Sequence, residues 1–276
     1  MPELPEVETV RRRLLPVMEG ARFTRVIVRR AGLRRPFPAD FAARLERRTV
    51  RALRRRGKFL LAELSSGETL VMHLGMSGSM RIEPSAAAKG RGDAAGRHDH
   101  VEFRMSSGAS VTFNDPRRFG VMDLVPPGLL ARHPAIGAMG PEPLEPGFDG
   151  AALARACVGK RTSLKAALLD QHVVAGLGNI YASEALHRAG LSPRRLASTV
   201  AAPSGASRPA AHRLAAAIRQ VLREAIARKA RPAYRMSRFR VYDHEGDRCR
   251  TPRCQGTIRR VVQAGRSTFY CPDCQK

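Results

Sequence analysis

The chain has 276 residues, 43% of them hydrophobic, which suits two folded domains and excludes a wholly disordered chain. No apolar run reaches the roughly 18 residues that a membrane span needs. The first ten residues, MPELPEVETV, lack the basic and apolar stretches of a secretory signal, so we expect a cytoplasmic protein without a membrane partner.

The charge is strongly positive, with 49 Lys and Arg residues against 24 Asp and Glu residues and a formal net charge of +25. Residues 151–276 hold most of this excess, with 24 basic residues against 7 acidic ones. A GC-rich genome would raise the Arg content, but it would not explain the scarcity of acidic residues. The charge therefore predicts a polyanionic partner, in the first place nucleic acid.

The first 125 residues predict one helix followed by antiparallel strands. Val7, Val10 and Leu14 recur at helical spacing after Pro5, and Pro16 is expected to end this helix. Alternating hydrophobicity predicts strands at 23–29, 50–54, 59–64, 69–74, 101–105 and 109–113. Short Gly and Ser turns between them favour an antiparallel sandwich or barrel.

Two further features lie within this β-rich region. Asp40 is expected to cap a short helix over 41–46. The stretch 84–96 is rich in Ala and Gly, which is typical of a loop.

The second half of the chain predicts helices. Residues 126–150 are rich in Pro and Gly and indicate a domain boundary. Helices are then expected over 151–157, capped by Asp149, and over 163–169, 180–189 and 210–229. We therefore expect a β-rich domain at 1–130, a hinge at 131–150, a helical domain at 151–239 and a hairpin at 240–276.

Four of the five cysteines predict a metal site. Cys249 and Cys254 are separated by four residues, and Cys271 and Cys274 by two, with 16 residues between the pairs. Two thiolate pairs on tight turns are typical of a structural Zn²⁺ site, which leaves no open position for chemistry. Cys157 stands alone on an apolar helical stretch and is expected to be a core residue.

Several segments carry a family resemblance in chain order. They are PELPEVETV at 2–10, GKFLL at 57–61, HLGMSGS at 73–79, HDHVEF at 98–103, NDPRRFG at 114–120, GPEPL at 140–144, GLGNIYASEAL at 176–186 and RSTFYCPDCQK at 266–276. By these segments the chain resembles, nearly end to end, the formamidopyrimidine-DNA glycosylase branch of the formamidopyrimidine-DNA glycosylase/endonuclease VIII family.

The resemblance implies an α+β protein. Its N-terminal antiparallel β-sandwich would have flanking helices, and a helix–two-turn–helix domain with a zinc-finger β-hairpin would follow. The implied activity is that of a bifunctional DNA glycosylase and AP lyase of base-excision repair, which removes formamidopyrimidines and 8-oxoguanine. The partner would be damaged double-stranded DNA, the cofactor one structural Zn²⁺, and the protein a bacterial monomer that joins the nucleoid when bound to DNA.

The resemblance also implies the catalytic residues. Removal of Met1 before the small Pro2 would free a secondary amine, and an α-amino group titrates near about 8, so a useful fraction is neutral. This amine would attack the sugar C1′ and form an iminium that drives β,δ-elimination. Glu3 would be the general acid and base, with Glu6 nearby. Lys58 would bind a phosphate and assist β-elimination, and Arg266 would support δ-elimination.

Other residues match the family's DNA contacts. Met76, Arg117 and Phe119 match the three side chains that fill the space left by the everted base, and Arg117 would also read the orphaned base. Three further residues match the family's phosphate or DNA contacts, namely His98, Lys160 and Asn179. Lys165 is a weaker candidate.

Two departures from the family pattern accompany the resemblance. The first cysteine pair has four intervening residues where two are commoner, which zinc tolerates. The segment 228–238 is shorter than the base-capping loop of purine-directed relatives. This short segment leaves open an alternative function, that of an oxidised-pyrimidine glycosylase of the endonuclease VIII type. A non-catalytic zinc-ribbon DNA-binding protein is the second alternative, against which the co-occurrence of Pro2, Glu3 and Lys58 argues.

Overall fold

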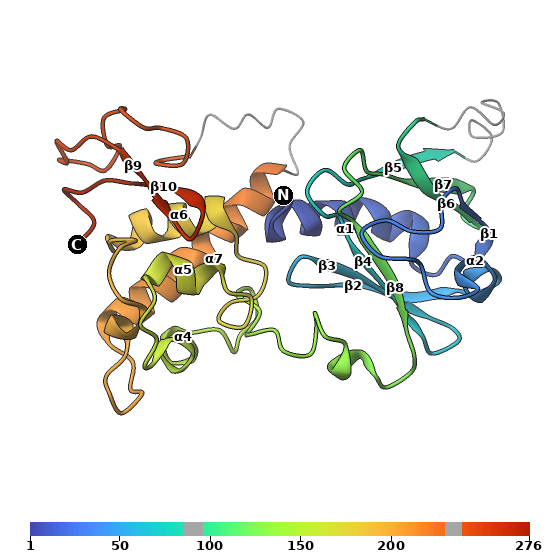
Figure 1. The fold of residues 1–276 in the computed structure, drawn as a ribbon, viewed down its shortest axis with the longest axis horizontal. Coiled ribbons are helices and arrows are strands. Elements are labelled where there is room, and N and C mark those ends of the chain that lie inside the picture. Colours follow the sequence, from blue (N-terminus) through green and yellow to red (C-terminus); the bar gives the residue numbers. More distant parts are fainter. Residues whose placement is uncertain (85–95, 230–238) are drawn as a thin grey trace. The chain divides into compact units, whose positions relative to one another are not determined.

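The computed structural model describes residues 1–84, 96–229 and 239–276 (Figure 1). They form two compact units, Met1–Gly137 and Ala138–Lys276. The predicted loop at 84–96 and the short segment at 228–238 lie almost entirely outside the described residues.

The first unit contains two four-stranded antiparallel sheets. Their strand orders are β1-β6-β7-β5 and β2-β3-β4-β8. The strands are β1 (Phe23–Val28), β2 (Val50–Arg56), β3 (Phe59–Leu64), β4 (Thr69–His73), β5 (Ser79–Pro84), β6 (Asp99–Met105), β7 (Ala109–Asn114) and β8 (Val121–Val125). A short 3-10 helix, η1 (Leu130–Arg132), follows β8.

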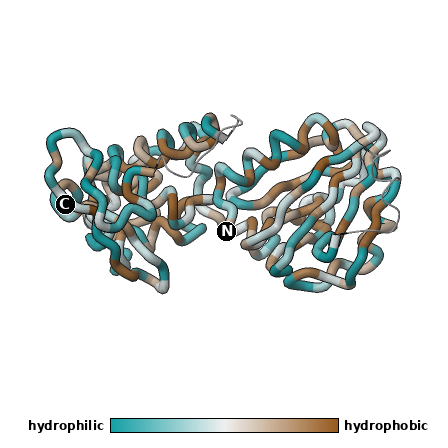
Figure 2. The backbone as a smooth tube through the Cα atoms, turned by 90° about the horizontal axis from the view of Figure 1, so that it is seen from above, coloured by the Kyte–Doolittle hydropathy of each residue, from teal (hydrophilic) through white to brown (hydrophobic). Residues whose placement is uncertain are grey.

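One hydrophobic core lies between the two sheets. Phe23 of β1 and Phe103 of β6 pack edge to face with ring centroids 5.4 Å apart, and Leu60 of β3 and Met72 of β4 join the same cluster. The backbone of this unit carries both hydrophobic and hydrophilic stretches (Figure 2), and β3 and β4 are buried at most of their positions. Because both sheets contribute to one core, the unit is a β-sandwich.

Helix α1 (Leu4–Met18) packs against β2 and β3 and adds Val7 and Leu14 to the core. The prediction that Pro16 ends this helix was wrong. Pro16 lies in the last turn, where its fixed φ suits the helix and its missing N–H removes a single hydrogen bond. Burial of Met18 at the helix end stabilises the additional residues.

Two further expectations for the first unit need correction. Helix α2 (Phe41–Leu45) forms where expected, but Asp40 has φ 54° and its side chain makes no capping bond. Its backbone carbonyl instead accepts from the Arg44 N–H at 2.8 Å. Strands β5 and β8 were not predicted. Both are edge strands, and Pro84 ends β5, which an edge tolerates.

The second unit contains four α-helices and a two-stranded ribbon in its described residues. They are α4 (Gly150–Cys157), α5 (Leu164–Leu169), α6 (Asn179–Ala189), α7 (Pro209–Lys229), β9 (Arg259–Gln263) and β10 (Arg266–Tyr270), with a 3-10 turn η2 (Ala197–Val200). The predicted Asp149 cap is confirmed, because its Oδ1 accepts from the Ala152 N–H at 2.7 Å. Helix α7 packs against both α4 and α6.

The ribbon turns tightly at Ala264 and Gly265. Their φ values, 48° and 70°, are both positive, as a two-residue type I′ hairpin turn requires. The buried cluster beside it is small and consists of Val241, Ile258, Phe269 and two of the cysteines. No helix among the described residues is long and apolar enough to cross a membrane.

Candidate functional site

The N-terminal residues lead directly into helix α1. Pro2 is half-buried and Glu3, the N-cap residue, is 3% exposed. The Glu3 N–H donates to Glu6 Oε2 at 2.8 Å. Glu6 therefore holds the backbone of Glu3, and the chain bearing the Pro2 nitrogen is anchored to the first turn of the helix.

Lys58 lies in the two-residue turn between β2 and β3. Gly57 has φ 55°, which places a left-handed residue at the first turn position. Lys58 is 7% exposed and close to His73, which pairs with Phe59 across the strands. Burial, with smaller contributions from Lys58 and Arg34, lowers the pKa of His73 to about 4, so this imidazole is neutral at pH 7.

Two loops carry the predicted insertion residues. Met76 and Phe119 are 43% and 40% exposed, and the Arg117 guanidinium lies 4.7 Å from the Phe119 ring centroid. The loops are closely apposed, since a Cβ on Gly75 would lie 2.4 Å from the Phe119 backbone. The structure thus brings Met76, Arg117 and Phe119 together at adjacent loop tips.

Asp115 organises these loops and was missed by the sequence reasoning. It is fully buried, and its carboxylate accepts from Ser77 Oγ at 2.6 Å and from the Gly120 N–H at 2.8 Å. Its own N–H donates to the His98 carbonyl at 3.0 Å, which places His98 beside the same loop. A carboxylate before a proline at the end of a strand was the available sequence signal.

In the second unit, Asn179 lies at the first turn of α6 and is fixed by two bonds. Its Oδ1 accepts from Lys165 Nζ at 2.6 Å, and its Nδ2 donates to the Ser267 carbonyl at 2.9 Å. Ser267 follows Arg266 on β10, so two predicted DNA contacts far apart in sequence lie near each other. Arg266 is exposed.

Lys165 is completely buried and also donates to Thr268 Oγ1 at 2.6 Å. Its weaker assignment as a DNA contact is therefore corrected: it positions Asn179 and β10 from inside the unit. Lys160, by contrast, has 37% of its side chain exposed and lies 3.7 Å from Asp170, an ion pair that leaves it accessible to a phosphate.

The four predicted cysteines converge. Their Sγ atoms lie within 4.8 Å of one another, with Cys249 to Cys274 at 3.8 Å and Cys254 to Cys271 at 3.6 Å. A tetrahedral Zn²⁺ with Zn–S bonds of about 2.3 Å separates its sulfurs by about 3.8 Å, so the set fits one zinc ion.

The surroundings of the sulfurs also suit a bound cation. The Gly256 N–H donates to Cys254 Sγ at 3.4 Å, and a Cβ at Gly256 would lie 2.6 Å from Cys271 Sγ. Burial, together with the neighbouring sulfurs, raises the pKa of Cys274, so four thiolates need a metal to coexist. Cys157 is outside this set and is fully buried, as expected.

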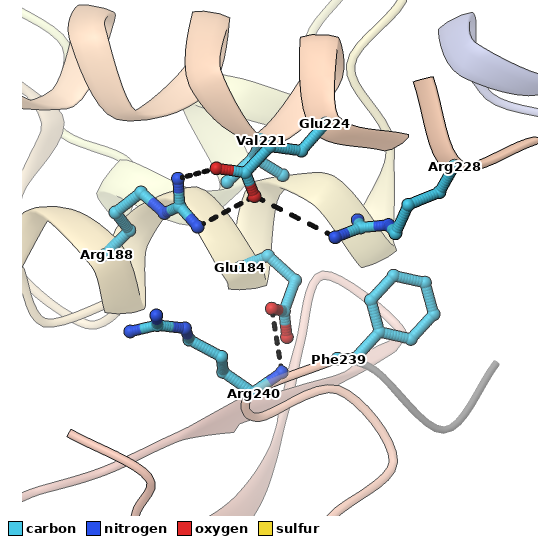
Figure 3. Close-up of a pocket in the computed structure, with 7 residues that line it drawn as sticks. All are labelled: Glu184, Arg188, Val221, Glu224, Arg228, Phe239 and Arg240. Atoms are coloured by element: carbon cyan, nitrogen blue, oxygen red, sulfur yellow. Dashed lines mark hydrogen bonds and ion pairs between the residues drawn. The ribbon is translucent and has the colours of Figure 1, made fainter. Parts of the chain in front are cut away.

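The chain before the ribbon is fastened to α6 by Glu184 (Figure 3). Its carboxylate accepts from the backbone N–H groups of Arg240 and Val241, both at 2.9 Å, and from that of Tyr242 at 3.0 Å. The adjacent pocket holds an ion pair between α6 and α7, in which Arg188 binds Glu224 at 2.7 and 2.9 Å. This bond lowers the pKa of Glu224.

The predicted site residues divide between the units. The first unit holds Pro2, Glu3, Lys58, Met76, His98, Arg117 and Phe119, and the second holds Lys160, Asn179, Arg266 and the four cysteines. A β-sandwich whose first helix begins at the buried Glu3, a second unit whose four cysteines fit one zinc ion, and a net charge of +25 are together typical of a zinc-containing DNA-binding protein.

Family models match three parts of the chain. The formamidopyrimidine-DNA glycosylase N-terminal domain matches residues 1–122, and the H2TH domain of the same glycosylase matches 139–235. A zinc finger found in FPG and IleRS matches 252–276, which covers three of the four cysteines. Cys249 precedes that match, and the structure supplies it as the fourth ligand.

Individual proteins agree with these matches. A formamidopyrimidine-DNA glycosylase of Azorhizobium caulinodans is 56% identical over the full length of both chains. The crystal structure of the MutM (Fpg) protein of Thermus thermophilus has a TM-score of 0.82 at 38% identity and covers 99% of this chain and 98% of that one. Lactococcus lactis Fpg, bound non-covalently to DNA containing an AP site, has a TM-score of 0.84 at 29% identity, with 99% of both chains covered.

The chain therefore belongs to the formamidopyrimidine-DNA glycosylase family. The predicted family, fold class and zinc site are confirmed. The roles of the individual site residues and the boundaries of the hinge stay predictions.

Proposed function

We propose that the amine of Pro2 is the nucleophile of a bifunctional DNA glycosylase and AP lyase. Family membership makes the chain a DNA glycosylase of base-excision repair that acts on damaged DNA. The observation that supports the residue assignment is the anchored N-terminus, where Pro2 adjoins the buried Glu3 and Glu6 fixes the intervening backbone.

The reaction begins once Met1 has been removed. The Pro2 nitrogen forms a bond to C1′ of the sugar, and the C1′–N bond to the damaged base breaks, with the electron pair leaving on the base. The proton that the Pro2 nitrogen gives up leaves with the base. Glu3 donates a proton to O4′ as the C1′–O4′ bond breaks and the lone pair of the Pro2 nitrogen forms the C=N bond, and general acid catalysis typically accelerates such a step by roughly 10² to 10⁴. Because proline is a secondary amine, the product is an iminium with a fixed positive charge.

Strand cleavage follows from that charge. The iminium acidifies the C2′ proton, so its removal expels the 3′ phosphate, and a second elimination expels the 5′ phosphate. Lys58 binds a phosphate beside the lesion and assists the first elimination, while Arg266 and Asn179 hold the strand in the second unit. The four cysteines would hold Zn²⁺, which supplies structure and no chemistry.

The everted base leaves an empty position in the stack. Met76 and Phe119 are exposed apolar side chains at adjacent loop tips, and Arg117 is stacked on Phe119. Apolar and planar groups are what a wedge into stacked bases requires. We assign these three residues to filling the stack and Arg117 to reading the opposite base, with His98 and Lys160 as further DNA contacts.

Oxidised purines are the proposed substrates, namely formamidopyrimidines and 8-oxoguanine. The name of the Azorhizobium relative supports this class. The alternative is an oxidised-pyrimidine preference, because the segment 228–238 is shorter than the base-capping loop of purine-directed relatives. Family membership sets aside a non-catalytic zinc-ribbon protein.

Borohydride trapping on matched duplexes distinguishes the two lesion classes. We expect stronger trapping on 8-oxoguanine opposite cytosine than on thymine glycol. The reverse order would reassign the chain to the pyrimidine class.

A variant with residues added before Pro2 tests the nucleophile. We expect loss of borohydride trapping and strand cleavage, with affinity for DNA containing an abasic-site analogue retained. Peptide mapping of the wild-type adduct should locate the sugar on Pro2. An adduct on a lysine side chain, or cleavage by the extended variant, would contradict the assignment.

The domain boundaries, assembly and location complete the proposal. We place a hinge at 131–150, separating the catalytic sandwich at 1–130 from the helical domain at 151–239 and the hairpin at 240–276, in a cytoplasmic monomer that joins the nucleoid on DNA. The net charge of +25 supports the association with DNA. DNA affinity should fall by roughly 10³ between 50 and 200 mM salt if about six phosphates are contacted. A flat salt response, or a dimer in light scattering, would contradict it.

A further inference from the structure

The zinc ribbon has a partner on α6 that lies outside the four-cysteine set. His187, in the last turn of α6, is 3% exposed. Its Nε2 lies 3.4 Å from Cys249 Sγ and 3.2 Å from Thr251 Oγ1. An imidazole from the helical part of the unit therefore contacts a metal ligand 62 residues away in sequence.

Thr251 connects this imidazole to a second sulfur. It lies between Cys249 and Cys254, and its N–H donates to Cys249 Sγ at 3.5 Å. Its hydroxyl oxygen is 3.8 Å from Cys274 Sγ. Since Cys249 and Cys274 are themselves 3.8 Å apart, His187 and Thr251 together cover one edge of the sulfur tetrahedron.

The chemistry of the contacts fixes their direction. A metal-bound thiolate has no proton and accepts hydrogen bonds only, so the ring nitrogen that faces it carries the proton. Nε2–H is then shared between Cys249 Sγ and the Thr251 hydroxyl oxygen, whose own proton points to Cys274. Nδ1 is buried and has no hydrogen-bond partner among the described residues, which fits a ring oriented by its Nε2 side.

We propose that His187 and Thr251 are outer-sphere partners of the zinc site, which donate hydrogen bonds to the thiolates and tie α6 to the metal. Hydrogen bonds of this kind orient the ligands and tune the metal, and their loss typically weakens metal affinity by roughly 10 to 100-fold. His187 is a positioning residue here, because it acts through Cys249 and does not bind the metal.

Zinc release from the full-length, zinc-loaded protein tests the proposal. A chromogenic chelator in excess reports the release rate. We expect His187→Phe to release zinc roughly 10 to 100-fold faster than the wild type, because the aromatic volume stays and the donor is lost. His187→Gln keeps an N–H donor at a similar reach and should restore slow release.

Two further variants separate a donor role from a packing role. Thr251→Val is nearly isosteric, removes the hydroxyl alone and leaves α6 unchanged, and it should accelerate release less than His187→Phe. The control is His172→Phe, the same substitution at a histidine whose side chain is 68% exposed, which should release zinc at the wild-type rate.

Cobalt substitution gives a spectroscopic signature of the same bonds. A hydrogen bond stabilises the sulfur lone pair, so its loss in His187→Phe should move the sulfur-to-cobalt charge-transfer band to longer wavelength, and His187→Gln should move it back. Wild-type release and an unshifted band in both His187→Phe and Thr251→Val would overturn the proposal. It would equally be overturned if His187→Gln released zinc as fast as His187→Phe.

Discussion

The two units position their predicted functional residues by different means. In the sandwich, an apolar core shared by two sheets supports the loops that carry Met76, Arg117 and Phe119. In the helical unit, the ribbon has a small core, and buried polar bonds from Lys165 and Glu184 hold it to the helices. The predicted insertion residues of the first unit are thus supported by an apolar core. The predicted DNA contacts near the ribbon of the second unit instead rely on a metal and a few hydrogen bonds.

Removal of zinc should show this contrast most strongly. Apparent zinc binding contributes roughly 10 kcal/mol or more to small zinc domains, and the ribbon's few buried apolar residues cannot replace it. A chelator should therefore raise amide hydrogen exchange across 240–276 and weaken DNA binding. Exchange in β3 and β6 should stay slow, and equal loss of protection in both units would refute the comparison.

The sandwich should fail through its core. Phe103→Ala, at a side chain with no exposure, should lower the free energy of unfolding by about 3 to 5 kcal/mol without changing zinc content. Denaturant titration measures the loss. Phe119→Ala is the matched control at a side chain that is 40% exposed, and it should change the free energy by only about 0.5 kcal/mol.

The helical unit should be sensitive to a single buried polar side chain. Lys165→Met removes the donor to Asn179 and Thr268, and it should destabilise the unit by about 3 kcal/mol. DNA affinity should fall as well, because Asn179 loses its orientation. Lys160→Met removes an accessible lysine and should weaken DNA binding with little change in stability. Similar unfolding curves for both variants would show that burial of Lys165 is unimportant.

The smallest expected effect is a pH dependence in the sandwich. The pKa of His73 is about 4 in the folded protein, below its usual 6.5. As the pH falls, the unfolded chain therefore binds a proton at this histidine before the folded protein does. Stability is complete above pH 6.5 and falls as the pH decreases toward 4, by about 2 kcal/mol at pH 5. His73→Gln should flatten this part of the profile, and an unchanged slope would assign it to other groups.

Local pattern was enough to predict much of the fold and the metal site. Strand periodicity placed β3 within its observed bounds, and the spacing of the four cysteines indicated their convergence. Pro16 was misread because proline is tolerated in the last turn of a helix that buries Met18.

The missed features depend on tertiary contacts. Strands β5 (SMRIEP) and β8 (VMDLV) alternate apolar and polar residues over only a few positions, and both lie at sheet edges, so these short runs were passed over in the sequence. Lys165 resembled a surface cation, because its partners Ser267 and Thr268 lie more than 100 residues away. A separation of 62 residues likewise concealed the contact between His187 and Cys249.

Because Cys157 lies outside the zinc site, the number of reactive thiols in the folded protein reports whether zinc is bound. Burial raises the pKa of this thiol to about 11, so a thiol reagent at pH 8 meets neither a thiolate nor an accessible sulfur there. The thiols that react in the folded protein would then be those of the ribbon alone. We expect none to react with zinc bound and four to react once zinc is removed. The fifth thiol reports only when the helical unit unfolds, so one colorimetric assay separates metal loss from denaturation.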